Sequence, residues 1–550
     1  MSRPARTLLH RARIYAGAAP GATPDAGPSE AMLTEADRVV WIGPQQRTRQ
    51  VLRELDPSAG DQVVDADGAL VTPAFCDAHV HLTMTGQGLD GIDLSTTASI
   101  SEALRFIESA ARHTRGRPIY AHSWDETRWV ERRALTATEL DRASYGGVVY
   151  APRIDAHSAS VSSAMAAVAR VHGLDGWDGS GLVTRDAFAT VTGAFTAGMT
   201  PADREHYLDL ALRAAAEQGI ALVHETGAAH LTSFDDIHHV LEAGTRAGRP
   251  HTVAYWGELV HDSERAAELH RHLGVIGLAG DLCADGSFGS RTAHLREPYL
   301  DDTGAPSGDY GYGYLDAAAI RDHVVACTRA GLQAGTHVIG DAALGAVTEG
   351  LRAAAEIVGR EAIRAAGHRL EHVELADAAS LDVLSDLGVW VSAQPAFDAV
   401  WGGVDGMYAA RLGRERALSV LPLRSMVRAG ARLAFGSDSP VTPFDPWGGV
   451  RAAVTHHCAD ERLSVTEAFA AHTRAGYAMG GVDGGLLRPG GAATYVIWDG
   501  PPGLDSETSM SSEPSGLPRF EHAHAPLPIA RRTVIDGLTA FDRTHDGGMP

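Results

Sequence analysis

Short apolar stretches alternate with Ala-rich helical segments through the middle of this chain, and this alternation constrains its fold most strongly. The pattern is typical of βα units, whose strands form a parallel sheet. Eight strands are the number that closes an α/β barrel. The apolar stretches are expected to end near His81, Glu225, Tyr255, Cys283, His337, His372, Gln394 and Asp438. The sequence therefore predicts an α/β fold built on a (β/α)8 barrel.

The two ends of the chain differ from its middle. Residues 1–72 contain β-rich stretches separated by turns, and residues 485–550 contain similar stretches around a Pro-, Ser- and Gly-rich segment at 499–530. We expect both ends to build one small β-sandwich domain together. The barrel is then expected to span residues 73–484. Residues 83–215 do not fit the βα repeat, so we predict an insertion over the barrel mouth, where barrel active sites lie.

Metal-competent side chains stand at several predicted strand ends. One short apolar strand delivers His79 and His81 at i and i+2, which places both on the same side of the strand. His337, His372 and Asp438 end three later stretches. Each alone is compatible with a core residue or a helix cap, and with 27 histidines in 550 residues about one His-x-His pair is expected by chance. Together they predict one converging metal site.

Composition argues against several classes of partner. The formal net charge of −22 disfavours nucleic acid and anionic membranes. No apolar run approaches the roughly 18 residues of a membrane span, and Arg11 and Arg13 lie where a signal peptide needs an apolar core. The four cysteines form no Cys-x-x-Cys pair, which indicates reduced thiols. We expect a cytoplasmic protein with a small-molecule substrate, and a homodimer only as the general tendency of soluble enzymes.

Several motifs extend this interpretation: Phe75-Cys76-Asp77-Ala78-His79-Val80-His81, Asp285-Gly286-Ser287-Phe288-Gly289-Ser290-Arg291-Thr292-Ala293, His337-Val338-Ile339-Gly340-Asp341-Ala342, Arg369-Leu370-Glu371-His372, Gln394-Pro395 and Gly436-Ser437-Asp438-Ser439-Pro440. Together they resemble the amidohydrolase superfamily, and within it the amidohydrolase-3 group related to N-substituted formamide deformylase. The resemblance covers essentially the whole chain. It implies a (β/α)8 barrel with a small β-sandwich, and hydrolysis of a non-peptide C–N bond at one or two divalent metal ions, usually Zn2+.

The chain departs from this resemblance at one position that matters for the metal. Many relatives carry a carboxylated lysine near the end of the fourth strand, where it bridges two ions, whereas Asp281 stands at the corresponding place here. Glu225, at the second strand end, is an oxygen donor that zinc accepts, although a salt-bridged role is the alternative. We expect Glu225 or Asp281 to replace the lysine. The predicted ligands are His79, His81, Glu225, His337, His372 and Asp438.

Asp438 is also the predicted catalytic residue. It is expected to take a proton from the attacking water and to pass it to the leaving amine. Trp124, His157 and Gln394 are the predicted substrate-binding residues. Trp124 and His157 lie in the insertion, where ordinary packing is the alternative for the tryptophan.

Two other functions stay open. The same fold and metal can deaminate a heterocyclic amine, for which Glu371 or Asp285 could supply an additional acid. A non-catalytic relative would have lost its metal ligands, whereas His79, His81, His337, His372 and Asp438 are all present. A serine hydrolase is disfavoured because the chain has no Gly-x-Ser-x-Gly motif. The sequence favours a metal-dependent hydrolase of an amide or an N-substituted formamide.

Overall fold

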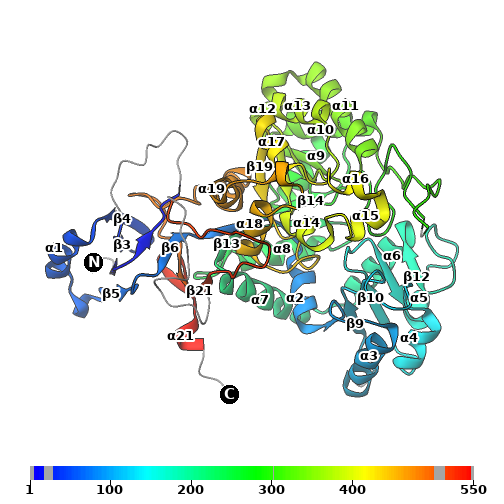
Figure 1. Ribbon diagram of the computed structural model, residues 1–550, viewed down its shortest axis with the longest axis horizontal. Coiled ribbons are helices and arrows are strands. Elements are labelled where there is room, and N and C mark those ends of the chain that lie inside the picture. Colours follow the sequence, from blue (N-terminus) through cyan, green and yellow to red (C-terminus); the bar gives the residue numbers. More distant parts are fainter. Residues whose placement is uncertain (1–4, 18–28, 115, 302, 501–514, 547–550) are drawn as a thin grey trace.

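Eight parallel strands form the centre of the computed structural model, which describes residues 5–17, 29–114, 116–301, 303–500 and 515–546. The strands follow one another around the sheet in chain order, and Figure 1 shows them surrounded by helices. They are β7 (Phe75–Val80), β13 (Ile220–Ala228), β14 (His251–Gly257), β15 (Gly277–Leu278), β16 (Gln333–Val338), β17 (Arg369–His372), β18 (Trp390–Ala393) and β19 (Arg432–Phe435). The predicted barrel is confirmed.

The first and last strands meet, so that the sheet nearly closes on itself. Val80 and Ser439 form a parallel bridge. The Asp438 N–H donates to the His79 carbonyl at 2.8 Å, and the His81 N–H donates to the Ser439 carbonyl at 2.9 Å. β7 and β13 are buried along their whole length, as strands of a parallel sheet covered on both faces are.

The helices around the barrel begin and end at well-defined caps. Thr200 and Asp203 form a capping box at the start of α7, and Pro201 occupies its first position. Asp316 caps α10, which ends at Gly331 with φ 74°. The helices are α2 (Leu82–Asp90), α7 (Pro201–Glu217), α8 (Phe234–Ala243), α9 (Ser263–Leu273), α10 (Ala317–Ala330), α11 (Asp341–Val358), α12 (Arg360–Ala366), α13 (Ala378–Asp386), α14 (Pro395–Trp401), α15 (Met407–Leu412), α16 (Arg414–Ala417), α17 (Leu423–Ala429), α18 (Pro446–Val454), α19 (Val465–Ala470) and α20 (Gly476–Met479), with short turns η3 (Ala459–Glu461) and η4 (Ala471–Ala475).

The two ends of the chain build two further sheets, which lie on the left in Figure 1. One sheet is N-terminal: β4 (Arg38–Gly43), β3 (Ala31–Glu35), β1 (Arg6–His10) and β5 (Gln62–Asp65). The other combines both ends: β2 (Arg13–Ile14), β6 (Leu70–Pro73), β20 (Tyr495–Asp499), β21 (Ile529–Ile535) and β22 (Leu538–Asp542). Short helices η1 (Gln45–Arg47), α1 (Thr48–Glu54), η2 (Pro57–Ala59) and α21 (Arg543–Asp546) flank them. Met32 and Ile497 belong to one apolar core shared by the two sheets, as in a β-sandwich.

A five-stranded sheet with its own helices lies between β7 and β13 in sequence. Its elements are β8 (Ile92–Asp93), α3 (Ile100–Thr114), β9 (Ile119–His122), α4 (Ala137–Ala143), β10 (Val149–Pro152), β11 (Ser158–Val161), α5 (Ser163–Ala169), β12 (Leu182–Thr184) and α6 (Arg185–Ala197). Two apolar clusters form its core, separately from the barrel core. Figure 1 shows this insertion and the terminal sheets on opposite sides of the barrel.

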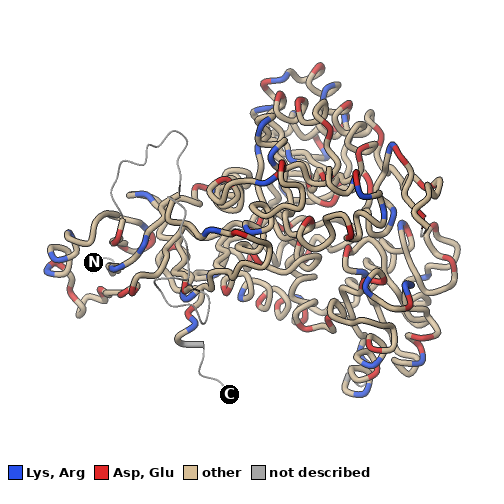
Figure 2. Tube along the Cα trace, in the orientation of Figure 1, with Lys and Arg blue, Asp and Glu red and all other residues tan. Residues whose placement is uncertain are grey.

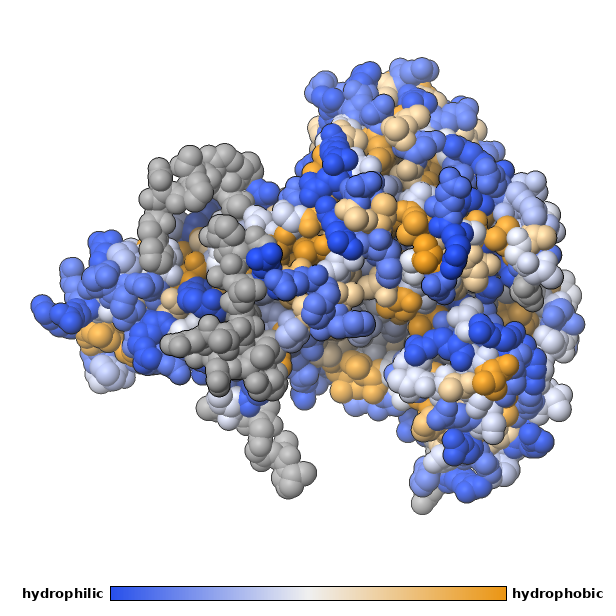
Figure 3. Space-filling view, viewed as in Figure 1, coloured by the Kyte–Doolittle hydropathy of each residue, from blue (hydrophilic) through white to orange (hydrophobic). Residues whose placement is uncertain are grey.

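Charged side chains of both signs are distributed over all three regions (Figure 2), and hydrophilic residues cover much of the visible surface of the barrel and the insertion (Figure 3). Among the described residues, no helix combines the length and apolar character that crossing a bilayer requires. The cytoplasmic location and the homodimer stay predictions.

Candidate active site

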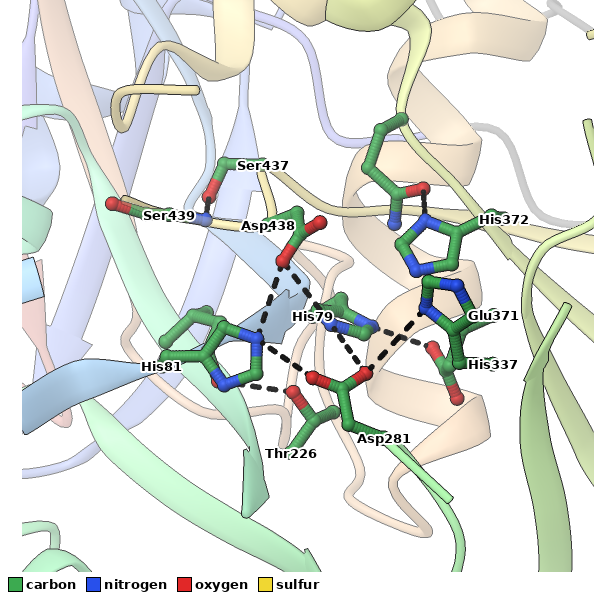
Figure 4. A network of polar contacts seen from close by, with 12 residues as sticks. His79, His81, Thr226, Asp281, His337, Glu371, His372, Ser437, Asp438 and Ser439 are labelled. Atoms are coloured by element: carbon green, nitrogen blue, oxygen red, sulfur yellow. Dashed lines mark hydrogen bonds and ion pairs between the residues drawn. The ribbon is translucent and has the colours of Figure 1, made fainter. Parts of the chain in front are cut away.

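Six metal-competent side chains converge at the carboxyl ends of the barrel strands (Figure 4). His79 is the second-last residue of β7, and His81 is the first residue after the strand. The other four come from β16, the end of β17 and the segments after β15 and β19; they are His337, His372, Asp281 and Asp438. All six are buried. Chain segments hundreds of residues apart thus deliver nitrogen and oxygen donors to one point.

The two carboxylates lie on either side of the histidines (Figure 4). Asp438 Oδ1 is 3.3 Å from Nε2 of both His79 and His81. Asp281 Oδ2 is 3.1 Å from His81 Nε2, while Asp281 Oδ1 is 3.6 Å from His79 Nε2 and 3.9 Å from His337 Nδ1. Three overlapping groups each place their ligand atoms within 4.8 Å of one another: His79, His372 and Asp438; His79, His81 and Asp281; and Asp281, His337 and His372. Each group could hold a metal ion.

Three of the histidines use their other ring nitrogen to donate to the protein. His79 Nδ1 lies 2.8 Å from Glu371 Oε2, His372 Nδ1 lies 2.8 Å from the amide oxygen of Gln394, and His337 Nε2 lies 3.1 Å from the Gly286 carbonyl. These acceptors place the proton on the nitrogen remote from the cluster. The lone pair of the other nitrogen therefore faces the two carboxylates, as in a metal ligand.

The backbone at the site adopts conformations that non-glycine residues seldom occupy. His372 has φ 69° and Asp438 has φ 57°. Such conformations cost free energy and persist where surrounding structure fixes them. Gly436 lies so close to β7 that a Cβ at this position would be 2.5 Å from the backbone nitrogen of His79. Close approach of β19 to β7 thus sets the position of Asp438 beside His79.

Charge inside the cluster affects the protonation of its members. Burial raises the pKa of Asp438, but His79, His81 and His372 lower it more, so that the pKa lies below its ordinary value. Burial and the neighbouring His372 lower the pKa of His337 well below its usual value. The site therefore combines ionised carboxylates with at least one imidazole that remains neutral, and both forms bind metal ions.

A cavity of about 290 Å3 opens above the cluster. Its floor includes His81, Asp281 and Asp438. Its walls come partly from the insertion, which contributes Asp155, Ala156, His157, Arg185, Asp186, Phe188 and Ala189. The barrel side adds Met84, His230, Leu231, Gly257, Leu282, Cys283, Tyr314, His337, His372 and Val441. A cavity of this size, with polar groups on its floor, fits a small molecule.

Comparison with known proteins agrees with this site. A family model described as the amidohydrolase family matches residues 62–540. The chain belongs to the amidohydrolase family.

The relatives of this amidohydrolase extend over nearly its whole length. YtcJ of Bacillus subtilis (strain 168), named as an amidohydrolase, is 25% identical over 550 residues, covering 94% of this chain and 96% of that protein. N-substituted formamide deformylase of Arthrobacter pascens is 23% identical over 549 residues, which cover 94% of this chain and 95% of that protein. The crystal structure of an uncharacterized metal-dependent hydrolase from Pyrococcus furiosus superposes with a TM-score of 0.67 at 25% identity, covering 90% of this chain and 98% of that one. This amidohydrolase is a metal-dependent hydrolase acting on C–N bonds other than peptide bonds.

The structure separates the two carboxylates that the sequence left as alternatives. Asp281 belongs to two of the three donor groups, whereas Glu225 belongs to none among the described residues. Glu225 Oε2 instead accepts the Leu82 N–H at 2.8 Å. Burial raises the pKa of Glu225 to about 7, which also disfavours an ionised ligand. Glu225 as a ligand stays a prediction, and the donor groups favour Asp281.

The three predicted substrate-binding residues have different positions in this amidohydrolase. His157 lines the cavity, and its ring centroid lies 4.9 Å from that of His337. Trp124 lies in the insertion core, where it stacks on Trp129 and donates to the Ala151 carbonyl. Gln394 is buried and does not line the 290 Å3 cavity; its amide oxygen binds His372 instead. The substrate-binding roles of Trp124, His157 and Gln394 stay predictions; the contacts of Trp124 are those of a packed side chain, and those of Gln394 orient a histidine.

The acids considered for a deaminase are also engaged elsewhere. Glu371 lies beneath the cluster, where its Oε1 binds Arg369 at 2.6 Å. Asp285 accepts backbone N–H groups of Ile339, Gly340 and His294 at 2.7 to 2.9 Å. Neither carboxylate lines the 290 Å3 cavity. The sequence had no signal for these contacts, because they depend on distances across the barrel.

Proposed function

We propose that this amidohydrolase cleaves N-acyl amines of the amide or N-substituted formamide type, with a divalent metal, Zn2+, in the six-residue cluster. The observation that carries the proposal is the convergence of His79, His81, Asp281, His337, His372 and Asp438 beneath one cavity. The relative from Arthrobacter pascens, by its name a deformylase of N-substituted formamides, supports this substrate class.

The donor atoms fit such an ion. His79 Nε2 and Asp281 Oδ1 are buried and have no hydrogen-bond partner among the described residues. Unpartnered buried polar atoms cost free energy, which a bound cation would offset. Imidazole nitrogens and carboxylate oxygens are ligands that zinc accepts. Because Asp281 belongs to one group with His81 and to another with His337, it replaces the bridging lysine and allows one ion or two.

The metal supplies two elements of chemistry when bound: it lowers the pKa of a coordinated water and polarises a carbonyl oxygen. The protein provides the proton transfer. Asp438 is 7% exposed, lines the cavity and remains ionised beside His79. It accepts the proton of the attacking water at Oδ1 or Oδ2 and delivers it to the nitrogen of the leaving amine. His157, on the cavity wall, contacts the substrate next to the reacting carbon.

The test is an assay of amine release from a panel of N-substituted formamides and N-acyl amines, with zinc-loaded and chelator-stripped protein. We expect release by the loaded protein, loss of release after stripping and recovery when zinc is added back. Ammonia release from purines or pyrimidines, without amine release from the panel, would replace this proposal by deamination. Metal binding without either activity would overturn both.

A further inference from the structure

A second, much smaller cavity adjoins the same cluster. Its volume is about 20 Å3, compared with about 290 Å3 for the large cavity. Both cavities are lined by His337, His372 and Asp438, and by His157 and Val441. The reacting centre therefore lies between one roomy and one narrow space.

Buried side chains form the far side of the small cavity. The walls that it does not share with the large cavity include Phe288, Ile339, Phe397, Met407 and Tyr408, all of which are buried. Its only half-buried lining residues, His157 and Val441, also line the large cavity. Among the described residues, the more exposed walls of the small cavity are thus the ones that it shares with the large cavity.

We propose that the small cavity is the acyl subsite, which admits a formyl or an acetyl group and excludes longer acyl chains. The amine substituent then occupies the large cavity. This inference rests on the proposed function, because it divides the N-acyl amine substrate between the two spaces. It narrows the substrate class to amines that carry a one- or two-carbon acyl group.

Volume sets the limit on the acyl group. On one and the same measure the small cavity has about 20 Å3 and the large cavity about 290 Å3, so the small cavity suits the smaller substituent of the substrate and fits each added carbon less well. Close-packed walls resist expansion. The aromatic ring of Phe397 stacks at 13° on His372, which fixes one wall against a member of the cluster.

The reaction determines which end of the substrate lies in the small cavity. Water adds its oxygen to the acyl carbon, the C–N bond breaks, and one water proton goes to the nitrogen, giving an amine and a carboxylic acid. The acid then loses the second proton to the amine or to solvent and leaves as a carboxylate. A bulky product formed in the small cavity would have to leave past buried side chains or past the cluster. Formate or acetate is small enough to leave through the large cavity once the amine has departed.

Polar groups at the edge of the small cavity suggest a competing occupant. Tyr408 donates to Glu374 at 2.6 Å, and Trp401 Nε1 is buried with no partner among the described residues. Such groups could bind one permanent water molecule. In that case the acyl group would extend into the large cavity, and its length would not matter.

A series of N-acyl derivatives of one amine tests the inference: formyl, acetyl, propionyl, butyryl and benzoyl. We expect kcat/KM to fall roughly 10- to 200-fold between acetyl and propionyl, which is the range for one methylene in a hydrophobic pocket, and amine size to have little effect. Equal rates through butyryl, or a limit on amine size instead, would overturn the acyl subsite while leaving the proposed function intact. If no member of the series is hydrolysed, the proposed function itself fails.

Two variants enlarge the small cavity by different amounts. Ile339→Val removes one carbon, and Met407→Ala removes more. We expect each to improve propionyl against acetyl by about 10-fold or more, with Met407→Ala extending the gain to butyryl. Phe188→Ala, in the large cavity, is the matched control and is expected to change the ranking of amines only. Metal content and thermal midpoint identify a variant that has lost its fold; Ile339→Val is conservative enough to fold. An unchanged acyl limit in folded variants would overturn the inference.

Discussion

The floor and the wall of the active-site cavity are built on different principles. The floor consists of strand-end metal-competent residues: His79 is 0% exposed, and hydrogen bonds that three histidines donate to Glu371, Gln394 and Gly286 fix their rings. The wall comes from the insertion and the adjoining loops, where Arg185 is half-buried and Tyr314 is 39% exposed. The barrel thus fixes the metal-competent side chains, while a separately folded layer lines the cavity above them.

The two layers are joined by buried charge. Arg153 of the insertion lies 2.8 to 3.3 Å from Asp155, Glu126 and Asp125. Asp155 in turn accepts a hydrogen bond from Ser287 on the barrel side, and Glu126 pairs with Arg411. Removing one member of such a network leaves an uncompensated buried charge. The wall is therefore fixed to the floor, so that effects of the two layers can be measured separately in one folded molecule.

Substitution of Asp438 is expected to have the largest effect. Asp438→Asn preserves the shape of the side chain and one oxygen donor but removes the proton acceptor. We expect kcat to fall by roughly 10²- to 10⁴-fold, with metal content unchanged. Measurement of steady-state kinetics alongside elemental analysis checks this. Turnover close to that of the wild type would place proton transfer on another group.

Substitution of Asp281 tests the floor as a metal site. Asp281→Ala removes a carboxylate shared by two donor groups, so we expect lower metal content. The loss of metal affinity is expected to be at least the roughly 10- to 100-fold that follows when a residue hydrogen-bonded to a metal ligand is replaced. Glu225→Gln is the matched control. Glu225 is also buried in a barrel strand, but its carboxylate accepts the Leu82 N–H and belongs to none of the three donor groups among the described residues. Equal metal loss in both variants would mean that the site responds to any change in packing.

The sequence predicted the floor far better than the wall. Strand ends at His81, His372 and Asp438 follow from apolar runs interrupted by metal-competent residues, and the structure places each within three residues of a strand end. The sequence did not distinguish Glu225 from Asp281. Glu225 lies inside β13, which continues to Ala228, whereas β15 ends at Leu278, so that Asp281 lies on the irregular segment that follows this strand. Strand length, rather than residue type, decides which carboxylate joins the histidine cluster.

Trp124 shows the same limit for the wall. Its large apolar side chain is compatible with either a cavity or a core, and the sequence does not record which face of the insertion it occupies. For His157, only the polar ring favoured a place in the cavity over a place in the insertion core. Arg185 and Tyr314 were not predicted as cavity residues, because each lies in a segment whose position depends on how the insertion packs on the barrel.

Substitution of His157 is expected to change the wall without changing the floor. His157→Ala removes a ring that lies 4.9 Å from His337 but belongs to none of the donor groups among the described residues. We expect metal content to stay constant while the ranking of substrates changes by about 10-fold. Kinetics with three or more amines check this. A loss of metal, or an equal loss for every substrate, would show that floor and wall are not independent.

The smallest effect is expected where a charged pair is exposed. At the seam between the barrel and the terminal sheets, His251 Nε2 lies 2.7 Å from Asp536 Oδ2, with the two side chains 42% and 41% exposed. The hydrogen bond to Asp536 raises the pKa of His251, and the bond from His251 lowers the pKa of Asp536. Solvent screens such a pair, so its contribution is below about 1 kcal/mol.

The direction of both pKa shifts defines the pH window of this contribution. The raised pKa of His251 means that the pair stabilises the fold fully below about pH 6.5, and that this contribution is lost as the pH rises through the raised value. The lowered pKa of Asp536 means that the pair stabilises the fold above about pH 4, and that this contribution is lost on acidification. Asp536→Asn keeps the oxygen that accepts from Thr494. We therefore expect it to lower the thermal midpoint slightly at pH 6 and not at pH 9. A difference in thermal midpoint that persists at pH 9 would mean that the substitution disturbs packing at this seam and not charge. Solvent exposure of the ion pair would then no longer explain why substitution here has a smaller effect than substitution in the buried floor.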